Sequence, residues 1–106
     1  MRLFRRSIRP TALLTVDSIM TQGAMLGLRS LGLAIPQDVS LIGFDDFDLA
    51  TFTEPPITVV AQPTAEIGRL AAQLLLERLE RRDLKPRSVR FPTKLLQRGS
   101  VRQLTS

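Results

Sequence analysis

The first third of the chain changes from a strand-like to a helix-like pattern of apolar residues. Residues 11–16 form a short apolar, β-branched run, which is typical of a buried strand. Asp17 and Ser18 follow, and both are favoured helix caps. Behind them, apolar residues recur at helical spacing until Gly32, a typical C-terminal stop. These residues are Met20, Ala24, Leu28 and Leu31. The pattern predicts a strand, a loop and a helix.

A second apolar run at residues 39–44 follows a turn at residues 36–38 and ends at the acidic pair Asp45 and Asp46. Two apolar strands joined through a helix indicate a right-handed βαβ crossover, and therefore a parallel sheet. We expect a fold of the α/β class built from parallel βαβ layers. A loop at residues 47–56 and a short extended run at residues 57–61 come next.

The longest helix is predicted to begin at Pro63, a residue favoured in the first helical turn, and to continue to about residue 82. Its apolar residues form a wide stripe. They are Ile67, Leu70, Ala71, Leu74, Leu75 and Leu79. Residues 83–86 end this helix. Residues 88–91 and 94–98 then indicate one or two short strands near a sheet edge, because Pro92 interrupts them and charges are frequent.

The composition narrows the possible functions. The 106 residues are enough for one small domain or a piece of a larger one. The absence of Cys and His removes thiol chemistry, disulfides, nearly all zinc sites and any histidine general base. No apolar run approaches the length of about 20 residues that a membrane helix needs, and no secretory cleavage pattern is visible. We therefore expect a cytoplasmic protein without a cofactor, a metal or a membrane partner.

Positive charge is concentrated at both ends of the chain. The net charge is +5, but residues 17–66 contain seven acidic residues and only Arg29 as a basic one. The basic ends show no helix-turn-helix spacing, no zinc-finger pattern and no basic stripe with regularly interleaved aromatic residues of the kind that stacks bases. Solvated surface charge is the ordinary interpretation of these arginines.

Acidic residues follow both predicted strands of the crossover. Ligands of open α/β sheets bind beyond the carboxyl ends of the strands, and the residues there are Asp17 after the first strand and Asp45, Asp46 and Phe47 after the second. Carboxylates accept hydrogen bonds from hydroxyls, amines or guanidinium groups, so a polar ligand fits. Structural roles remain open, with Asp17 as a helix cap and the acidic pair as a turn. A receiver-type magnesium site would need further convergent carboxylates.

Three sequence blocks resemble the sensor domain of the LacI/GalR family of transcription regulators. The blocks are P-x-D-V-S-L-I-G-F-D-D at residues 36–46, P-P-I-T-V-V-x-Q-P at residues 55–63 and L-x-x-R-G-S at residues 95–100. The resemblance implies part of a periplasmic-binding-protein-like type I fold, namely its C-terminal subdomain, over residues 10–102. Residues 1–9 form a basic leader that matches nothing in this pattern, and residues 103–106 form a tail.

The resemblance also implies roles for individual residues. Asp45 falls on the position whose carboxylate holds the effector, and Asp17 on a position usually occupied by Asn. Because an ionised Asp only accepts hydrogen bonds, this departure favours an effector rich in donors. Gln62 corresponds to the passage between subdomains, in the hinge or the cleft floor, and Phe47 joins the candidate ligand-binding residues. Met20, Phe47 and Phe52 are candidates for a dimer surface, with core packing as the alternative.

The function that follows is effector sensing without catalysis, for a sugar or another small polar molecule. The resemblance implies a homodimer that contacts DNA only through a helix-turn-helix head, and residues 1–106 contain no such head. A sugar-binding component of a transport system, which shares the fold, is the alternative. An enzyme is disfavoured, because the chain offers no His, no Cys and no Gly-rich phosphate loop.

Overall fold

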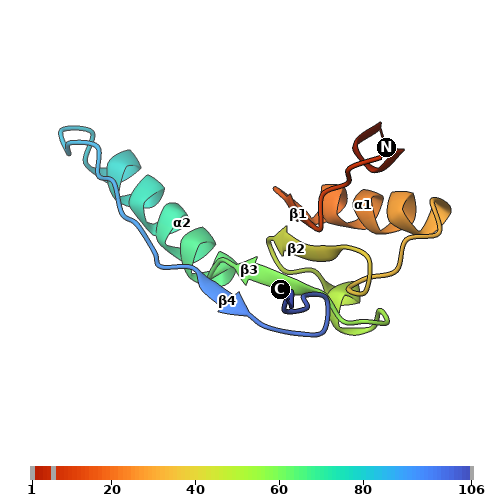
Figure 1. The fold of residues 1–106 in the computed structure, drawn as a ribbon. Coiled ribbons are helices and arrows are strands. Elements are labelled where there is room, and N and C mark those ends of the chain that lie inside the picture. The colour runs from red at the N-terminus through yellow and green to blue at the C-terminus, as the bar shows by residue number, and fades with distance from the viewer. Residues whose placement is uncertain (1, 6, 106) are drawn as a thin grey trace. The chain divides into compact units, whose positions relative to one another are not determined.

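A four-stranded sheet organises the first of two compact units in the computed structural model, which describes residues 2–5 and 7–105. The strands are β1 (Ala12–Thr15), β2 (Ser40–Phe44), β3 (Thr58–Ala61) and β4 (Lys94–Leu96). They are ordered β1-β2-β3-β4, with β1, β2 and β3 parallel and β4 antiparallel to β3 (Figure 1). The predicted α/β fold class and the parallel sheet are confirmed.

Helix α1 (Ser18–Ser30) joins β1 to β2 and lies against one face of these strands (Figure 1). It begins as the sequence predicts, because the Asp17 carboxylate accepts a hydrogen bond from the Met20 backbone N–H at 2.7 Å. It ends where Gly32 adopts a φ of +71°, a conformation that glycine reaches without a steric penalty. The βαβ crossover therefore forms from local signals at both ends of its helix.

Two apolar clusters form the core of the first unit. One contains the buried residues Ala24, Leu41, Ala50, Ile57 and Val59. The other contains Phe4, Leu28 and Val39. Phe4 comes from the basic leader, in a 3-10 helix, η1 (Arg2–Arg5), and only 4% of its surface is exposed. The leader therefore contributes a side chain to the core, which the sequence pattern did not indicate.

Between β2 and β3, the predicted loop contains a short 3-10 helix, η2 (Asp48–Thr51). Ala50 of this turn is buried, and its carbonyl accepts a hydrogen bond from the Ile57 N–H at 2.8 Å. The η2 turn is thereby held close to the start of β3. A connection between parallel strands usually contains a full helix, and here a loop closed by one turn is sufficient.

The second unit, Gln62–Thr93, consists of helix α2 (Thr64–Glu80) and a segment that runs back along it (Figure 1). The predicted helix is confirmed, and Pro63 occupies the N-cap position. No residue of α2 is buried, and Leu75, Leu76 and Leu79 of its apolar face are each about 60% exposed. None of the helices in the described part of the chain is long and apolar enough to cross a membrane.

Of the one or two short strands predicted at the C-terminal end, one forms. Residues 88–91 form no strand and lie in the second unit, where the described residues provide no strand to pair with them. The other forms as β4, at the edge of the sheet, but covers only Lys94–Leu96 of the predicted residues 94–98. A strand-like sequence therefore does not form a strand where no neighbouring strand offers hydrogen-bond partners to its backbone.

Gly43 of β2 is predicted to tolerate no side chain. A Cβ atom built at Gly43 would lie 2.7 Å from Oγ1 of Thr21, which is fully buried on α1. We expect Gly43→Ala to lower the free energy of unfolding by about 1–3 kcal/mol, the usual cost of overpacking. Urea unfolding followed by circular dichroism measures this difference.

Gly23 of α1 is the matched control, since a Cβ atom there would meet nothing within 4 Å. Gly23→Ala should be neutral or stabilising by up to about 1 kcal/mol, because alanine favours helix. Removing the obstruction with Thr21→Ala in the Gly43→Ala background should recover part of the loss. Equal stability of the two glycine variants would contradict the predicted clash.

Candidate functional site

The two carboxylates predicted to bind ligand lie at the same edge of the sheet. Thr15 and Gly43 form the last residue pair between β1 and β2. Asp17 lies two residues after Thr15, and Asp45 lies two residues after Gly43. Because β1 and β2 are parallel, their carboxyl ends meet at one edge, where open α/β sheets bind ligands. The structure thus brings together the candidates from the two strand ends of the first unit.

Asp17 has the structural role that the sequence left open. One of its carboxylate oxygens caps α1, and its backbone carbonyl accepts a hydrogen bond from the Thr21 hydroxyl at 2.8 Å. The Thr21 hydroxyl also lies 2.6 Å from that of Thr15 in β1. The half-buried carboxylate of Asp17 is thereby fixed to the helix, while its backbone is linked to β1 through the Thr21 hydroxyl. A ligand-binding role for it stays a prediction.

Asp45 leaves the sheet in an unusual backbone conformation. Its φ of +74° lies in the left-handed region, which few residues other than glycine adopt and in which Asp and Asn are the common exceptions. Its backbone N–H donates to the Val60 carbonyl of β3 at 2.9 Å. The turn role of Asp45 is therefore confirmed, and its half-buried position at the end of β2 suits contact with a bound molecule.

Asp46 forms an ion pair that the sequence analysis missed. Arg98 donates from Nη1 to Oδ1 and from Nη2 to Oδ2 of Asp46, each at 2.9 Å. The Arg98 side chain is only 15% exposed, and that of Asp46 is 38% exposed. The hydrogen bonds from Arg98 lower the pKa of Asp46, and the same contact raises the pKa of Arg98. The arginine of the L-x-x-R-G-S block is the only sequence signal of this ion pair. The pattern does not identify Asp46 as its partner, because the two residues are remote in sequence.

The stability of the chain should depend on pH through this pair. Because the folded-state pKa of Asp46 is lowered, its contribution is fully present above the unfolded-state pKa of about 4. It is lost as the pH falls through the lower folded-state value. We therefore expect the stability difference between the wild type and Asp46→Asn to be constant above about pH 5 and to shrink below about pH 4. Urea unfolding across this range measures it, and a difference independent of pH would contradict the assignment.

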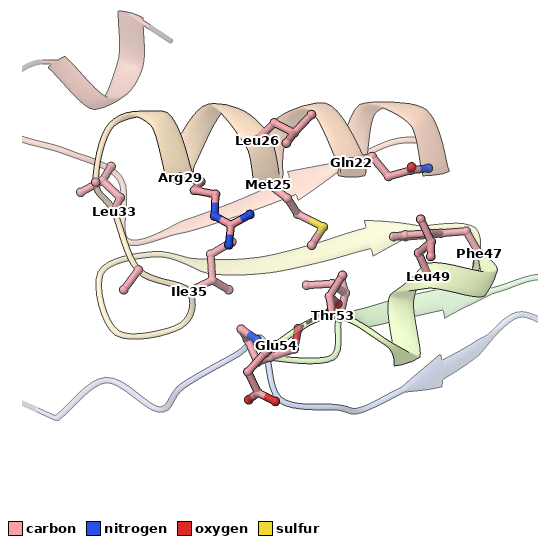
Figure 2. Close-up of a pocket in the computed structure, with 14 residues that line it drawn as sticks. Gln22, Met25, Leu26, Arg29, Leu33, Ile35, Phe47, Leu49, Thr53 and Glu54 are labelled. Carbon is pink, nitrogen blue, oxygen red and sulfur yellow. Dashed lines mark hydrogen bonds between the residues drawn. The ribbon is translucent and has the colours of Figure 1, made fainter.

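A pocket of about 700 Å³ opens between α1 and the loop around η2, and we call it the α1–η2 groove (Figure 2). Figure 2 shows Gln22, Met25 and Arg29 of α1 on one side, with Phe47, Leu49 and Thr53 of the loop opposite them. Most of the groove is apolar, and Arg29 and Glu54 are its charged residues. Phe47 lines this groove and packs against the core.

The remaining predicted residues divide between the two units. Met20 is 54% exposed and Phe52 is 82% exposed, so the alternative of core packing is wrong for both. Gln62 directly follows β3 as the first residue of the second unit, and its carbonyl accepts a hydrogen bond from the Thr64 N–H at 2.9 Å. Its place in the hinge or the cleft floor stays a prediction. Within residues 2–5 and 7–105, no cluster of three or more His, Cys, Asp or Glu side chains could hold a metal ion.

Comparison with known proteins places this architecture in a family. A family model described as the periplasmic binding protein-like domain matches residues 1–101, which includes the leader. The HTH-type transcriptional repressor CytR of Escherichia coli K12 is 41% identical over 95 residues, which are 90% of this chain and 28% of the repressor. The chain thus spans less than a third of the length of this curated relative.

Solved structures agree with this assignment. A putative LacI transcriptional regulator from Bacillus cereus subsp. cytotoxis has a TM-score of 0.88 at 27% identity, over 94% of this chain and 36% of that one. A LacI family transcriptional regulator from Enterococcus faecium with bound ribose has a TM-score of 0.82 at 30% identity, over 94% and 36%. The chain therefore belongs to the periplasmic binding protein-like domain family, in which its relatives are LacI-family transcription regulators, and it represents a part of that domain.

Proposed function

We propose that this chain is the effector-sensing part of a LacI-type transcription regulator. The observation that carries the proposal is the position of Asp45, whose half-buried carboxylate leaves the end of β2 at the ligand-binding edge of a parallel sheet. The cap at Asp17 places a second carboxylate at the same edge. A pair of acceptors suits a ligand with several hydroxyl groups.

The proposed effector is a small sugar or a related polar molecule. The regulator from Enterococcus faecium is described with bound ribose, and it covers nearly the whole of this chain. In the proposed mechanism, the effector binds one arrangement of the two halves of the sensor better than the other. This differential affinity shifts the population of DNA-binding states, and the sensor itself catalyses no reaction.

The proposed regulator is a cytoplasmic homodimer that contacts DNA through a separate helix-turn-helix head. Support for a dimer surface comes from Met20 on α1 and Phe52 after η2, which are both largely exposed. The apolar α1–η2 groove lies on the same two elements and includes Phe47. Isolated exposed apolar residues are common, but an apolar groove with exposed apolar residues beside it is typical of an interface.

A hybrid regulator tests the proposed function. Residues 10–102 of this chain would replace the matching segment of the ribose-bound Enterococcus faecium regulator, which supplies the rest of a sensor. Isothermal titration with D-ribose and with other pentoses, hexoses and nucleosides should reveal saturable binding of at least one of them. Circular dichroism would establish that the hybrid is folded, and the unmodified regulator is the positive control. A folded hybrid that binds none of these compounds would refute the proposal.

A further inference from the structure

We propose that Arg98 is a positioning residue for the effector site: its forked ion pair with Asp46 fixes the backbone turn that presents the neighbouring Asp45 carboxylate. The inference rests on the proposed function for the role of Asp45. The positioning itself concerns only contacts within the first unit. In this proposal Asp46 has a positioning role through Arg98, and the effector contact belongs to Asp45.

Arg98 is anchored by four hydrogen bonds. Both terminal nitrogens meet the Asp46 carboxylate, and Nη1 also donates to the Ile57 carbonyl at 2.9 Å. Its backbone N–H donates to the Thr58 hydroxyl at 2.9 Å. The side chain therefore reaches from the beginning of β3 to the loop that follows β2. A planar guanidinium held by two parallel bonds has little freedom to move, which a single bond to lysine would not reproduce.

The backbone of Asp45 is held on both sides. A left-handed backbone at a residue other than glycine persists only where the surroundings determine it. On one side, the Asp45 N–H is held by the Val60 carbonyl of β3. On the other side, the next residue is Asp46, which Arg98 holds. The Asp46 carboxylate also accepts a bond from the Phe47 N–H at 3.0 Å, so the turn is closed directly after Asp45.

The charges of Asp46 and Arg98 neutralise each other, and both terminal guanidinium nitrogens of Arg98 donate to the Asp46 carboxylate. Asp46 is therefore occupied within the protein and is a poor candidate for contact with an effector.

Amide hydrogen exchange on the 106-residue chain tests the positioning directly. In Arg98→Met, exchange of the Asp45 amide should accelerate about tenfold or more, because a charged hydrogen bond that held the turn is lost. The amide of Leu33, which donates to Leu28 at the end of α1, should keep its rate. Arg98→Lys should give an intermediate acceleration, since it keeps the charge but loses the fork.

A matched control and a second variant separate local from global effects. Arg87→Met removes the same group from an exposed ion pair with Glu77 at 3.8 Å and should leave the Asp45 amide unchanged. Asp46→Asn, which keeps the side-chain shape, should reproduce the local acceleration if Arg98→Met does not fold. Equal acceleration of the Asp45 and Leu33 amides, or none at Asp45, would overturn the inference.

The hybrid regulator provides the functional arm. If the hybrid binds D-ribose or another sugar, Arg98→Lys should weaken that binding about threefold to tenfold, because lysine keeps the charge but only part of the contact with Asp46. Arg87→Met should leave the binding unchanged. Sugar binding that is insensitive to Arg98→Lys would overturn the positioning role. A folded hybrid that binds no sugar would instead refute the proposed function, and amide exchange would then decide the structural part of the inference alone.

Discussion

Replacement of Asp45 by Asn should weaken effector binding in the hybrid regulator by roughly tenfold to a hundredfold. The substitution keeps the shape of the side chain but removes its charge, and one charged hydrogen bond contributes about 1.5–3 kcal/mol. The hybrid should still fold, because Asp45 lies at the end of β2 and Asn also tolerates the left-handed backbone at a φ of +74°. Isothermal titration of the wild-type and substituted hybrids with D-ribose, or with whichever sugar binds, measures the loss.

Asp48 provides the matched control for this experiment. It lies three residues further along the chain, in η2, and is exposed, so Asp48→Asn makes the same change of charge away from the sheet edge. We expect Asp48→Asn to leave the affinity within about twofold, as surface charges normally contribute little. If Asp45→Asn and Asp48→Asn bind equally well, Asp45 is only a turn former, and its assignment as the effector carboxylate would have to be withdrawn.

Replacement of Ser100 by Ala should lower the free energy of unfolding by about 2–6 kcal/mol. Ser100 is fully buried, and its hydroxyl donates to the Leu41 carbonyl at 2.5 Å while accepting from the Thr58 N–H at 2.8 Å. Alanine would leave both buried backbone groups without this partner, and each unsatisfied group costs about 1–3 kcal/mol. Such a loss is a large part of the usual 5–15 kcal/mol of a folded domain. Urea unfolding followed by circular dichroism measures it.

Ser30 is the matched control for Ser100. Its hydroxyl donates to the Gly27 carbonyl at the exposed end of α1, so Ser30→Ala should change stability by less than about 0.5 kcal/mol. Ser100→Cys, which retains a weak donor of similar size, should fall between the wild type and Ser100→Ala. A loss below about 1 kcal/mol for Ser100→Ala would show that other groups satisfy Thr58 and Leu41.

The residues around α1 show how far local patterns predict this fold. The cap at Asp17 and the left-handed Gly32 lie in sequence beside the helix that they delimit, and the sequence pattern predicts both ends of the helix. The pattern also predicts the ends of β1 and β2, and the parallel pairing of these strands places Asp17 and Asp45 at one edge. These features depend on residues within a few positions of one another, or on a crossover whose handedness is nearly fixed.

Contacts between remote residues were not predictable in this way. Arg98 and Asp46 are 52 residues apart, and Thr58 and Ser100 are 42 residues apart. A sequence pattern shows that Arg98 is charged and Ser100 is small, but not which group each one meets. The same limit applies to Phe4, whose burial depends on packing with Leu28 and Val39. It also applies to residues 88–91, which have the composition of a strand but no partner strand in the described structure.

The sequence by itself therefore determined the α/β class, the limits of α1, the position of the carboxylates after β1 and β2, and the family to which these blocks belong. Only the tertiary structure decided that Asp46 is held by Arg98 while Asp45 turns out of the sheet, and that the hydroxyl of Ser100 joins β2 to β3. The physical reason is the range of the interactions. Hydrophobic periodicity and caps act between neighbours in the chain, whereas the partner of a buried charge or hydroxyl is set by the packing of the whole unit.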